Sequence, residues 1–243
     1  MSAQIVVHCI QHSERVRALS VADWAAARGI DLRIIRVDRG EPLPAAPLVQ
    51  RLVVLGGAMM TDEVDEHPWL VLEREWLRAV VEHGEAKVLG ICLGSQLLAE
   101  ALGGSVERAE VPEVGWQRIV RTEAGDDHPV LAALPREFDA MQWHYDAWTL
   151  PPGAALAATS DGCATQAFTY GEDVLAVQFH PEFTFDRTRE LVDSTTDDLT
   201  PRGHVQSPDQ FLADPERFAR LRELCFDLLD RALDVQVAAP ISS

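Results

Sequence analysis

Basic side chains are scarce in this sequence of 243 residues. Lys and Arg together number 21 against 39 Asp and Glu, which gives a formal net charge of −18. A field of that sign repels phosphate backbones and anionic headgroups, so we expect neither a nucleic-acid nor a membrane partner. No stretch approaches the roughly 18 consecutive apolar residues that a membrane span requires. Because 47% of the residues are hydrophobic, the chain can instead form one large or two small packed domains.

Cysteine is also sparse, and its spacing is informative. The four cysteines are far apart and form no C-x-x-C pair: Cys9, Cys92, Cys163 and Cys225. This spacing excludes a dense disulfide framework and the usual zinc motifs, so we predict no metal site. The first residues lack the basic segment and apolar core of a secretory signal. A reducing cytoplasm is therefore the expected compartment.

Strand and helix patterns alternate over the first hundred residues. Short apolar runs typical of buried strands alternate with helical spacing, and Ser13, Pro68, Gly29 and Gly84 are candidate helix boundaries. The expected strands cover 4–10, 31–37, 51–57 and 86–91, and the expected helices cover 13–29, 69–84 and 95–104. Such alternation predicts an α/β fold with a mainly parallel central sheet and helices on both faces.

The pattern changes after Gly104. Short strands joined by turns are expected at 105–111, 115–122, 139–146, 154–160, 163–170 and 173–180, which predicts a smaller antiparallel β part. Helices follow at about 185–193 and 216–234, the second packing on the sheet or, as an alternative, forming a dimer seam. We expect a single domain over 1–237 and a flexible tail at 238–243. The polar segment 193–216 is interpreted as a solvated surface loop or, alternatively, as a lid or docking surface.

One cysteine lies where an apolar strand turns into a helix, in the run Gly90-Ile91-Cys92-Leu93-Gly94. This is the G-x-nucleophile-x-G pattern of a nucleophile elbow, in which a sharp turn needs glycines because Cβ atoms would clash. The start of the following helix favours a thiolate, and the next N–H can donate to an oxyanion. The alternative for Cys92, and our interpretation of Cys9 and Cys225, is an ordinary buried thiol.

A histidine that could serve this cysteine occurs in the run "VLAVQFHPEF". A buried strand ends there in His180-Pro181-Glu182, so the carboxylate can fold back onto one imidazole nitrogen while the other faces a sulfur. Alone, this tripeptide would be read as a turn that ends a strand. Together with the elbow at Cys92, it indicates a Cys-His-Glu catalytic arrangement.

The two motifs together resemble those of the class I glutamine amidotransferases. "GICLGSQLLAEALGG" is similar to that family's nucleophile signature, "QFHPE" to its histidine signature, and Gly56-Gly57 to its oxyanion strand. "PEVGWQRI" and "MQWHYD" resemble the free-standing branch that is similar to the glutaminase domain of GMP synthase. The resemblance implies a flavodoxin-like fold over roughly residues 5–190.

The resemblance also implies a role for each matching residue. Cys92 would be the nucleophile, His180 the general base and acid, and Glu182 the group that orients the imidazole. The remaining implied site residues are two oxyanion donors and three substrate-pocket residues: Gly57 and Leu93, then Gln96, Trp143 and His144. No cofactor is implied.

Three features depart from the family pattern. Ala58 stands where the oxyanion loop commonly has a proline, so we expect a less rigid loop that substrate or a partner would order. Trp143 replaces a smaller residue of the GMP synthase type, which weakens the case for strict recognition of free glutamine. The segment 193–216 has no counterpart in the minimal domain.

The leading functional hypothesis is hydrolysis of the γ-carboxamide of glutamine, or of another γ-glutamyl amide, through a cysteine thioester. The chain has no G-x-x-x-x-G-K loop, so ammonia would pass to a separate ATP-dependent synthetase. The alternative is a self-sufficient γ-glutamyl peptide or amine hydrolase. A non-catalytic binding module and a cysteine-elbow enzyme without H-P-E are weaker alternatives, since "FHPEF" and Cys92 are both present. The oligomeric state stays open.

Overall fold

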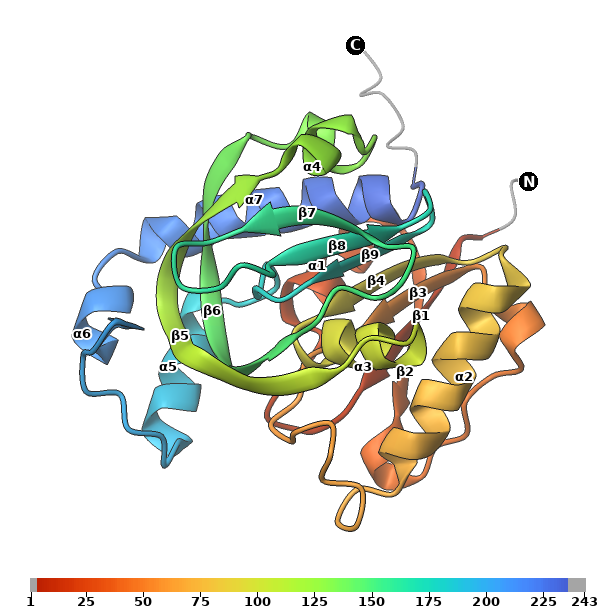
Figure 1. The fold of residues 1–243 in the computed structure, drawn as a ribbon, viewed down its shortest axis with the longest axis horizontal. Coiled ribbons are helices and arrows are strands. Elements are labelled where there is room, and N and C mark those ends of the chain that lie inside the picture. The colour runs from red at the N-terminus through yellow and green to blue at the C-terminus, as the bar shows by residue number, and fades with distance from the viewer. Residues whose placement is uncertain (1–3, 236–243) are drawn as a thin grey trace.

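A twisted central sheet with helices on both sides forms the body of the protein (Figure 1). The structure is a computed structural model and describes residues 4–235. Five neighbouring strands run parallel, in the order β2 (Asp31–Arg36), β1 (Val6–Gln11), β3 (Arg51–Val54), β4 (Lys87–Ile91) and β9 (Val174–Val177). The prediction of an α/β fold with a mainly parallel sheet is confirmed.

Antiparallel strands extend the sheet beyond β9. They follow in the order β8 (Ala167–Tyr170), β7 (Ala155–Thr159) and β5 (Val106–Arg121), and β6 (Glu137–Trp148) pairs with β5. The expectation of two strands at 105–111 and 115–122 was wrong, because β5 is one strand. Its pairing with β6 continues on both sides of a register shift between Arg108 and Glu113.

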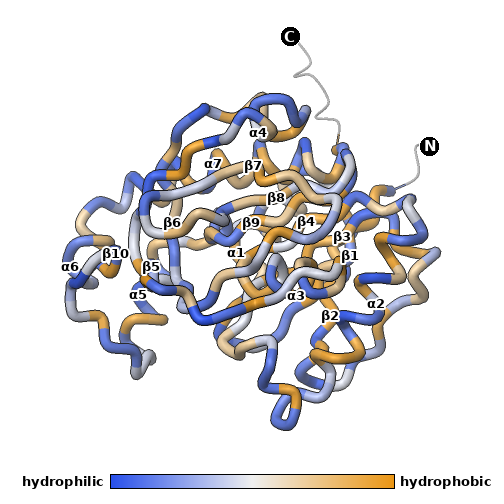
Figure 2. The backbone as a smooth tube through the Cα atoms, in the orientation of Figure 1, coloured by the Kyte–Doolittle hydropathy of each residue, from blue (hydrophilic) through white to orange (hydrophobic). Residues whose placement is uncertain are grey.

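Two layers of helices cover the two faces of the sheet. The helices α1 (Leu19–Arg28) and α7 (Pro215–Ala232) contact each other on one side, and α2 (Trp69–His83) and α3 (Leu93–Ala101) contact each other on the opposite side. Each side has its own apolar core. Figure 2 shows apolar residues along the central strands, whereas the outlying loops are largely hydrophilic. The interpretation that the last helix packs on this body agrees with its buried residues, which include Phe218, Leu221 and Cys225.

The first helix starts later than the sequence suggests. Ser13 does not cap it, because α1 begins at Leu19 with Ala18 at the N-cap position. The hydroxyl of Ser13 instead accepts a hydrogen bond from the N–H of Val16 at 3.2 Å, a local turn that competes with helix formation. Residues 13–18 are thereby left as a loop, and Arg15 and Val16 of this loop line the main pocket.

The segment 193–216 is folded against the sheet, so the interpretation of a purely solvated loop was wrong. After α5 (Phe185–Ser194), it contains the short strand β10 (His204–Val205), which pairs with β5, and the short helix α6 (Pro208–Phe211). Val205 and Phe211 are buried in the core. A few apolar residues within a polar sequence are therefore sufficient to attach this segment.

The remaining elements are short. The helix α4 (Glu123–Asp127) follows β5, and 3-10 helices lie at Val37–Arg39, Ala46–Leu48 and Leu131–Ala133. The predicted flexible tail at 238–243 lies outside the described residues. Within residues 4–235, no helix combines the length and apolar composition needed to cross a lipid bilayer.

Candidate active site

Cys92 forms the sharp turn between β4 and α3. Its backbone has φ 50° and ψ −109°, a conformation that non-glycine residues rarely adopt and that typically marks a functional site. The flanking glycines make the turn possible. A Cβ atom on Gly94 would lie 2.2 Å from the carbonyl oxygen of Val54, and one on Gly90 would lie 2.8 Å from the carbonyl oxygen of Gly94. The strand and helix therefore approach too closely for any side chain at these two positions.

His180 and Glu182 form a buried pair at the end of the neighbouring strand. Nδ1 of His180 lies 2.8 Å from Oε1 of Glu182, and both side chains are almost completely buried. The backbone N–H of His180 donates to the carbonyl of Met141, and its ring stacks on Phe183 with centroids 4.1 Å apart. These contacts hold the imidazole in one orientation and leave its Nε2 edge for another partner.

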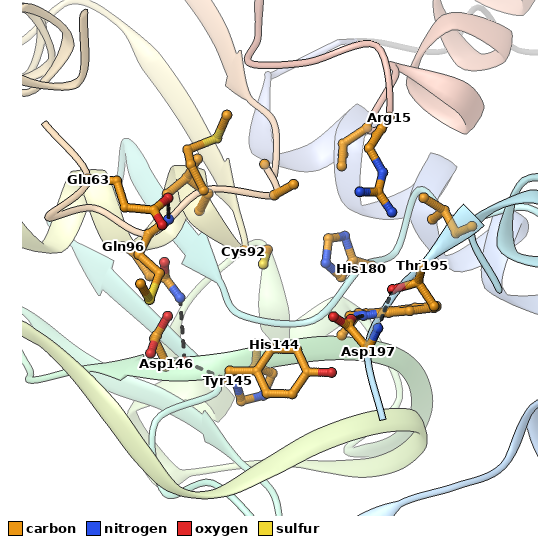
Figure 3. Close-up of a pocket in the computed structure, with 18 of the residues that line it drawn as sticks. Arg15, Glu63, Cys92, Gln96, His144, Tyr145, Asp146, His180, Thr195 and Asp197 are labelled. Atoms are coloured by element: carbon orange, nitrogen blue, oxygen red, sulfur yellow. Dashed lines mark hydrogen bonds between the residues drawn. The ribbon is translucent and has the colours of Figure 1, made fainter. Parts of the chain in front are cut away.

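The imidazole of His180 and the side chain of Cys92 converge on Gly56. A Cβ atom on Gly56 would lie 2.9 Å from Cε1 of His180 and 3.4 Å from Cβ of Cys92. Both side chains also line one pocket, where Figure 3 shows them facing each other. The structure thus brings together three residues that the sequence analysis selected from two distant motifs.

Electrostatics at His180 favour the charged imidazole. Burial by itself lowers the pKa of His180, but the adjacent charges of Glu182 and Cys92 outweigh burial and raise this pKa to about 10. The direction of this shift favours the imidazolium form of the ring at neutral pH. An imidazolium next to a sulfur stabilises the thiolate, which is the nucleophilic form of cysteine.

Two backbone N–H groups beside Cys92 are free to donate. Within residues 4–235, neither Gly57 nor Leu93 donates its N–H to a protein acceptor. Leu93 is the first residue of α3, so its N–H has no acceptor within the helix. A Cβ atom on Gly57 would lie 2.4 Å from Cδ2 of Leu93, which places the two residues in contact at the pocket wall.

The pocket around Cys92 has a volume of about 480 Å³. Of the residues selected from the sequence, all except Glu182 line it: Gly57, Cys92, Leu93, Gln96, Trp143, His144 and His180. Nε2 of Gln96 donates to the carbonyl of Asp146 at 3.4 Å, and Nδ1 of His144 lies 3.0 Å from the same oxygen. The pocket is large enough for a substrate bigger than one amino-acid side chain.

Sequence reasoning missed several groups at this site. The amide of Gln178 donates to Sγ of Cys92 at 3.7 Å, and Glu113 holds Nε2 of His144 at 2.9 Å. Gln178 precedes His180 by two positions, so the strand period of two was an available signal for it. No local signal marks Glu113, because its partner comes from the neighbouring strand β6.

The segment after α5 supplies part of the pocket wall. Thr195, Thr196, Asp197 and Asp198 line it. The indole N–H of Trp143 donates to Oδ2 of Asp197 at 2.8 Å. Burial, together with the charge and hydrogen bond of Asp197, raises the pKa of the Tyr145 phenol well above its usual value. In Figure 3, Asp197 and Thr195 lie on the His180 side of Cys92, whereas Glu63, Gln96 and Asp146 lie on the opposite side.

One group of side chains has the composition of a metal site. Potential ligand atoms of Glu113, His144 and Cys163 lie within 4.8 Å of one another. Hydrogen bonds account for their positions, because Glu113 accepts from Ser160 at 2.6 Å and is paired with His144. Burial raises the pKa of the Cys163 thiol, which disfavours the thiolate that a metal would need.

Known proteins similar to this chain share both its sequence and its fold. Residues 20–194 match the family model described as glutamine amidotransferase class-I. The chain is 34% identical over 197 residues to the glutamine amidotransferase-like protein YfeJ of Salmonella typhimurium, covering 79% of this chain and 82% of that protein. It is 38% identical over 109 residues to a subunit of the glutamine-hydrolysing GMP synthase of Thermococcus kodakarensis, covering 43% of this chain and 56% of that relative.

Solved structures agree with these relatives. A glutamine amidotransferase from Methylobacillus flagellatus superposes with a TM-score of 0.87 at 27% identity, covering 99% of both chains. One from Thermotoga maritima superposes with a TM-score of 0.81 at 27% identity, covering 95% of this chain and 99% of that one. The family match covers most of the chain, including the strand and helix around Cys92 and the strand that ends at His180. The chain belongs to the class I glutamine amidotransferases.

Proposed function

We propose that this protein hydrolyses the γ-carboxamide of glutamine, or of another γ-glutamyl amide, through a thioester on Cys92. The observation that carries the proposal is the convergence of Cys92 with the buried His180–Glu182 pair at a pocket. A strained nucleophile, an oriented imidazole and free N–H donors are the parts that acyl transfer requires.

In the first half of the reaction, the Cys92 thiolate attacks the side-chain carbonyl carbon of the bound amide. The carbonyl oxygen becomes an oxyanion, which the N–H groups of Gly57 and Leu93 stabilise. Loss of one such donor typically costs about 10²–10³ in rate. The imidazolium of His180 then gives its proton to the amine nitrogen, the C–N bond breaks, and ammonia or an amine leaves.

In the second half, His180 is neutral and takes a proton from an incoming water. The resulting hydroxide attacks the thioester carbonyl, and the same two N–H groups hold the second oxyanion. The C–S bond breaks, glutamate leaves, and the thiolate–imidazolium pair is restored. Glu182 holds Nδ1 of His180 throughout, which keeps Nε2 directed at the sulfur.

The two sides of the pocket suit the two ends of such a substrate. Because His180 protonates the leaving nitrogen, the amine occupies the His180 side, and the amino-acid end occupies the opposite side with Gln96 and Glu63. Glu63 and Arg108 both line the pocket, and they carry the charges that complement an α-amino and an α-carboxylate group.

The fate of the amine has two candidate answers. The relatives named as subunits of glutamine-hydrolysing GMP synthases support a protein that supplies ammonia to a separate synthetase. A self-sufficient hydrolase of γ-glutamyl amines is supported by Asp197, which lies on the His180 side and can contact a larger amine. The minimal chemistry at Cys92 is the same in both.

The test is an assay of glutamate release by the purified protein alone, with glutamine and with a γ-glutamyl anilide as substrates. Wild-type protein should release glutamate, and Cys92→Ala should release none while keeping its fold. Cys225→Ala is the matched control, because it removes a core thiol that does not line the pocket and should retain activity. Full activity of Cys92→Ala would contradict the proposal. Activity only after addition of an ATP-dependent synthetase would identify the ammonia-supplying version.

A further inference from the structure

A second buried imidazole–carboxylate pair lies beside the first and has no part in the mechanism above. Nε2 of His12 lies 3.0 Å from Oε1 and 3.1 Å from Oε2 of Glu73, and both side chains are 0% exposed. His12 directly follows β1, and Glu73 comes from α2. Nδ1 of His12 lies 3.0 Å from the carbonyl oxygen of Gly56, in the strand-end loop that also carries Gly57.

The partners of His12 determine its protonation. A carboxylate and a backbone carbonyl are both acceptors, so both ring nitrogens must carry hydrogen for the two bonds to form. Burial lowers the pKa of His12, but Glu73 and the Gly56 carbonyl outweigh burial and raise it. Asp38 also acts on His12 in the raising direction. Trp69 stacks on the ring at 5.4 Å with an interplanar angle of 20°, which further favours a cation.

The hydrogen bond to Gly56 controls the next N–H along the chain. The carbonyl of Gly56 and the N–H of Gly57 belong to the same planar peptide unit. This peptide is trans, since the described residues contain no cis peptide bond, and a trans peptide directs its C=O and N–H to opposite sides. When His12 holds the carbonyl on its own side, the N–H of Gly57 must point away from His12. Gly57 lines the pocket and His12 does not.

We propose that His12 and Glu73 are positioning residues that lock the Gly56–Gly57 peptide with its N–H directed into the oxyanion hole. The proposal rests on the proposed function, because it assigns Gly57 as an oxyanion donor. It also accounts for Ala58, which stands where the family commonly has a proline. The buried ion pair holds this loop from outside, whereas a proline would stiffen it from within.

The pair also strengthens the donor that it orients. A charge-assisted hydrogen bond to the carbonyl of Gly56 polarises the peptide and makes the N–H of Gly57 more acidic. Without His12, the peptide can rotate so that its N–H leaves the pocket, and the oxyanion loses one of two donors. The loss should affect turnover far more than substrate binding, because the oxyanion exists only after attack.

Two double variants separate this role from simple structural damage. Removing one partner would leave a buried unpaired charge, so both are replaced together. His12→Asn/Glu73→Gln keeps an amide donor near the position of Nδ1, whereas His12→Leu/Glu73→Leu removes every donor with side chains of similar size. His67→Asn is the control, because His67 contacts the same Trp69, with ring centroids 5.6 Å apart, without bonding to Gly56.

The measurements are kcat and KM for glutamate release and the rate at which iodoacetamide alkylates Cys92. The Leu/Leu variant should lose about 10²–10³ in kcat with KM changed less than about threefold. The kcat of the Asn/Gln variant should be at least about tenfold higher than that of the Leu/Leu variant, and the kcat of His67→Asn should match wild type. Alkylation should stay near the wild-type rate throughout, because Cys92, His180 and Glu182 are untouched.

Wild-type kcat in the Leu/Leu variant would overturn the proposal. Equal losses in both double variants together with lost alkylation would also overturn it, since they would indicate a structural role only. If wild-type protein hydrolyses no γ-glutamyl substrate, either alone or with an ATP-dependent synthetase added, the proposed function fails by itself. Crystal structures of the two double variants then decide the positioning role. The proposal requires a rotated Gly56–Gly57 peptide in Leu/Leu and the wild-type orientation in Asn/Gln, and an unrotated peptide in Leu/Leu overturns it.

Discussion

The indole of Trp143 on β6 donates its N–H to the carboxylate of Asp197 at 2.8 Å. This bond ties the segment after α5 to the strand that also carries His144, so the segment forms part of the pocket wall. A residue that stands out in the sequence mainly as a source of bulk therefore acts as a hydrogen-bond donor to a remote part of the chain.

Trp143→Phe should loosen this wall while keeping an aromatic ring in place. We expect faster trypsin cleavage at Arg202 and a several-fold rise in KM for γ-glutamyl anilides, because Asp197 loses the indole donor. Limited proteolysis and steady-state kinetics measure the two effects. Trp76→Phe is the control, because it removes an equivalent indole bond, to the carbonyl of Pro44 at 2.6 Å, away from the pocket. Equal changes in trypsin cleavage and in KM for the two variants would contradict a specific role for Trp143.

Alkylation of the native protein should mark Cys92 alone. Burial raises the pKa of Cys9 to about 12, and burial also raises the pKa values of Cys163 and Cys225. A thiol with a raised pKa reacts slowly because the thiolate is the nucleophile. Mass spectrometry after brief treatment with iodoacetamide at neutral pH should find one adduct, which Cys92→Ala abolishes. Equal labelling of Cys163 would show that the environment of Cys92 is not special.

The raised pKa of His180 predicts that stability falls with increasing pH. Its ordinary value is 6.5 and its value in the folded protein is about 10, so the folded state holds an extra proton between these values. The stabilisation is complete below about pH 6.5 and is lost as the pH rises through about 10. The free energy of unfolding, measured by urea denaturation at several pH values, should fall as the pH rises over this range. His180→Gln should make this pH dependence shallower, with a remainder from His12, whose pKa is also raised, and Trp76→Phe should keep it. An unchanged pH dependence in His180→Gln would refute the assignment.

Gly94→Ala should destabilise the protein strongly. The added Cβ would meet the carbonyl oxygen of Val54 at 2.2 Å, and a backbone atom cannot move aside as a side chain could. Overpacking of this kind typically lowers the free energy of unfolding by about 1–3 kcal/mol. We expect a loss at the upper end of this range, together with loss of activity. Gly171→Ala is the control, since its Cβ meets no atom within 4 Å and only its φ of +61° is unfavourable. That conformation costs about 1–2 kcal/mol. A smaller cost at Gly94 than at Gly171 would disprove the steric argument.

Local patterns explain why much of the fold could be predicted. The elbow around Cys92 is specified by glycines two positions away, since a tight turn restricts its immediate neighbours in the chain. The parallel sheet follows from apolar runs alternating with helical spacing. The predicted start of α1 was wrong because the hydroxyl of Ser13 accepts a hydrogen bond within a local turn and does not cap a helix. The prediction that β5 is two strands was wrong because its pairing with β6 continues past the register shift.

Contacts between distant segments could not be predicted in the same way. In the sequence, Glu73 is an ordinary acidic residue of an amphipathic helix. Only the folded structure buries it against His12 and so gives it a partner. Asp197 lies in a polar stretch that resembles any solvated loop until Trp143 reaches it.

The order of residues along the chain was enough to single out Cys92, His180 and the strand–helix framework, because each depends on neighbours within a few positions. Packing of the folded chain was needed to assemble the pocket wall and to place the buried imidazole of His12 behind Gly56. Hydrogen bonds and charges act over a few ångströms in space, and the distance along the chain between their partners leaves no pattern in one sequence.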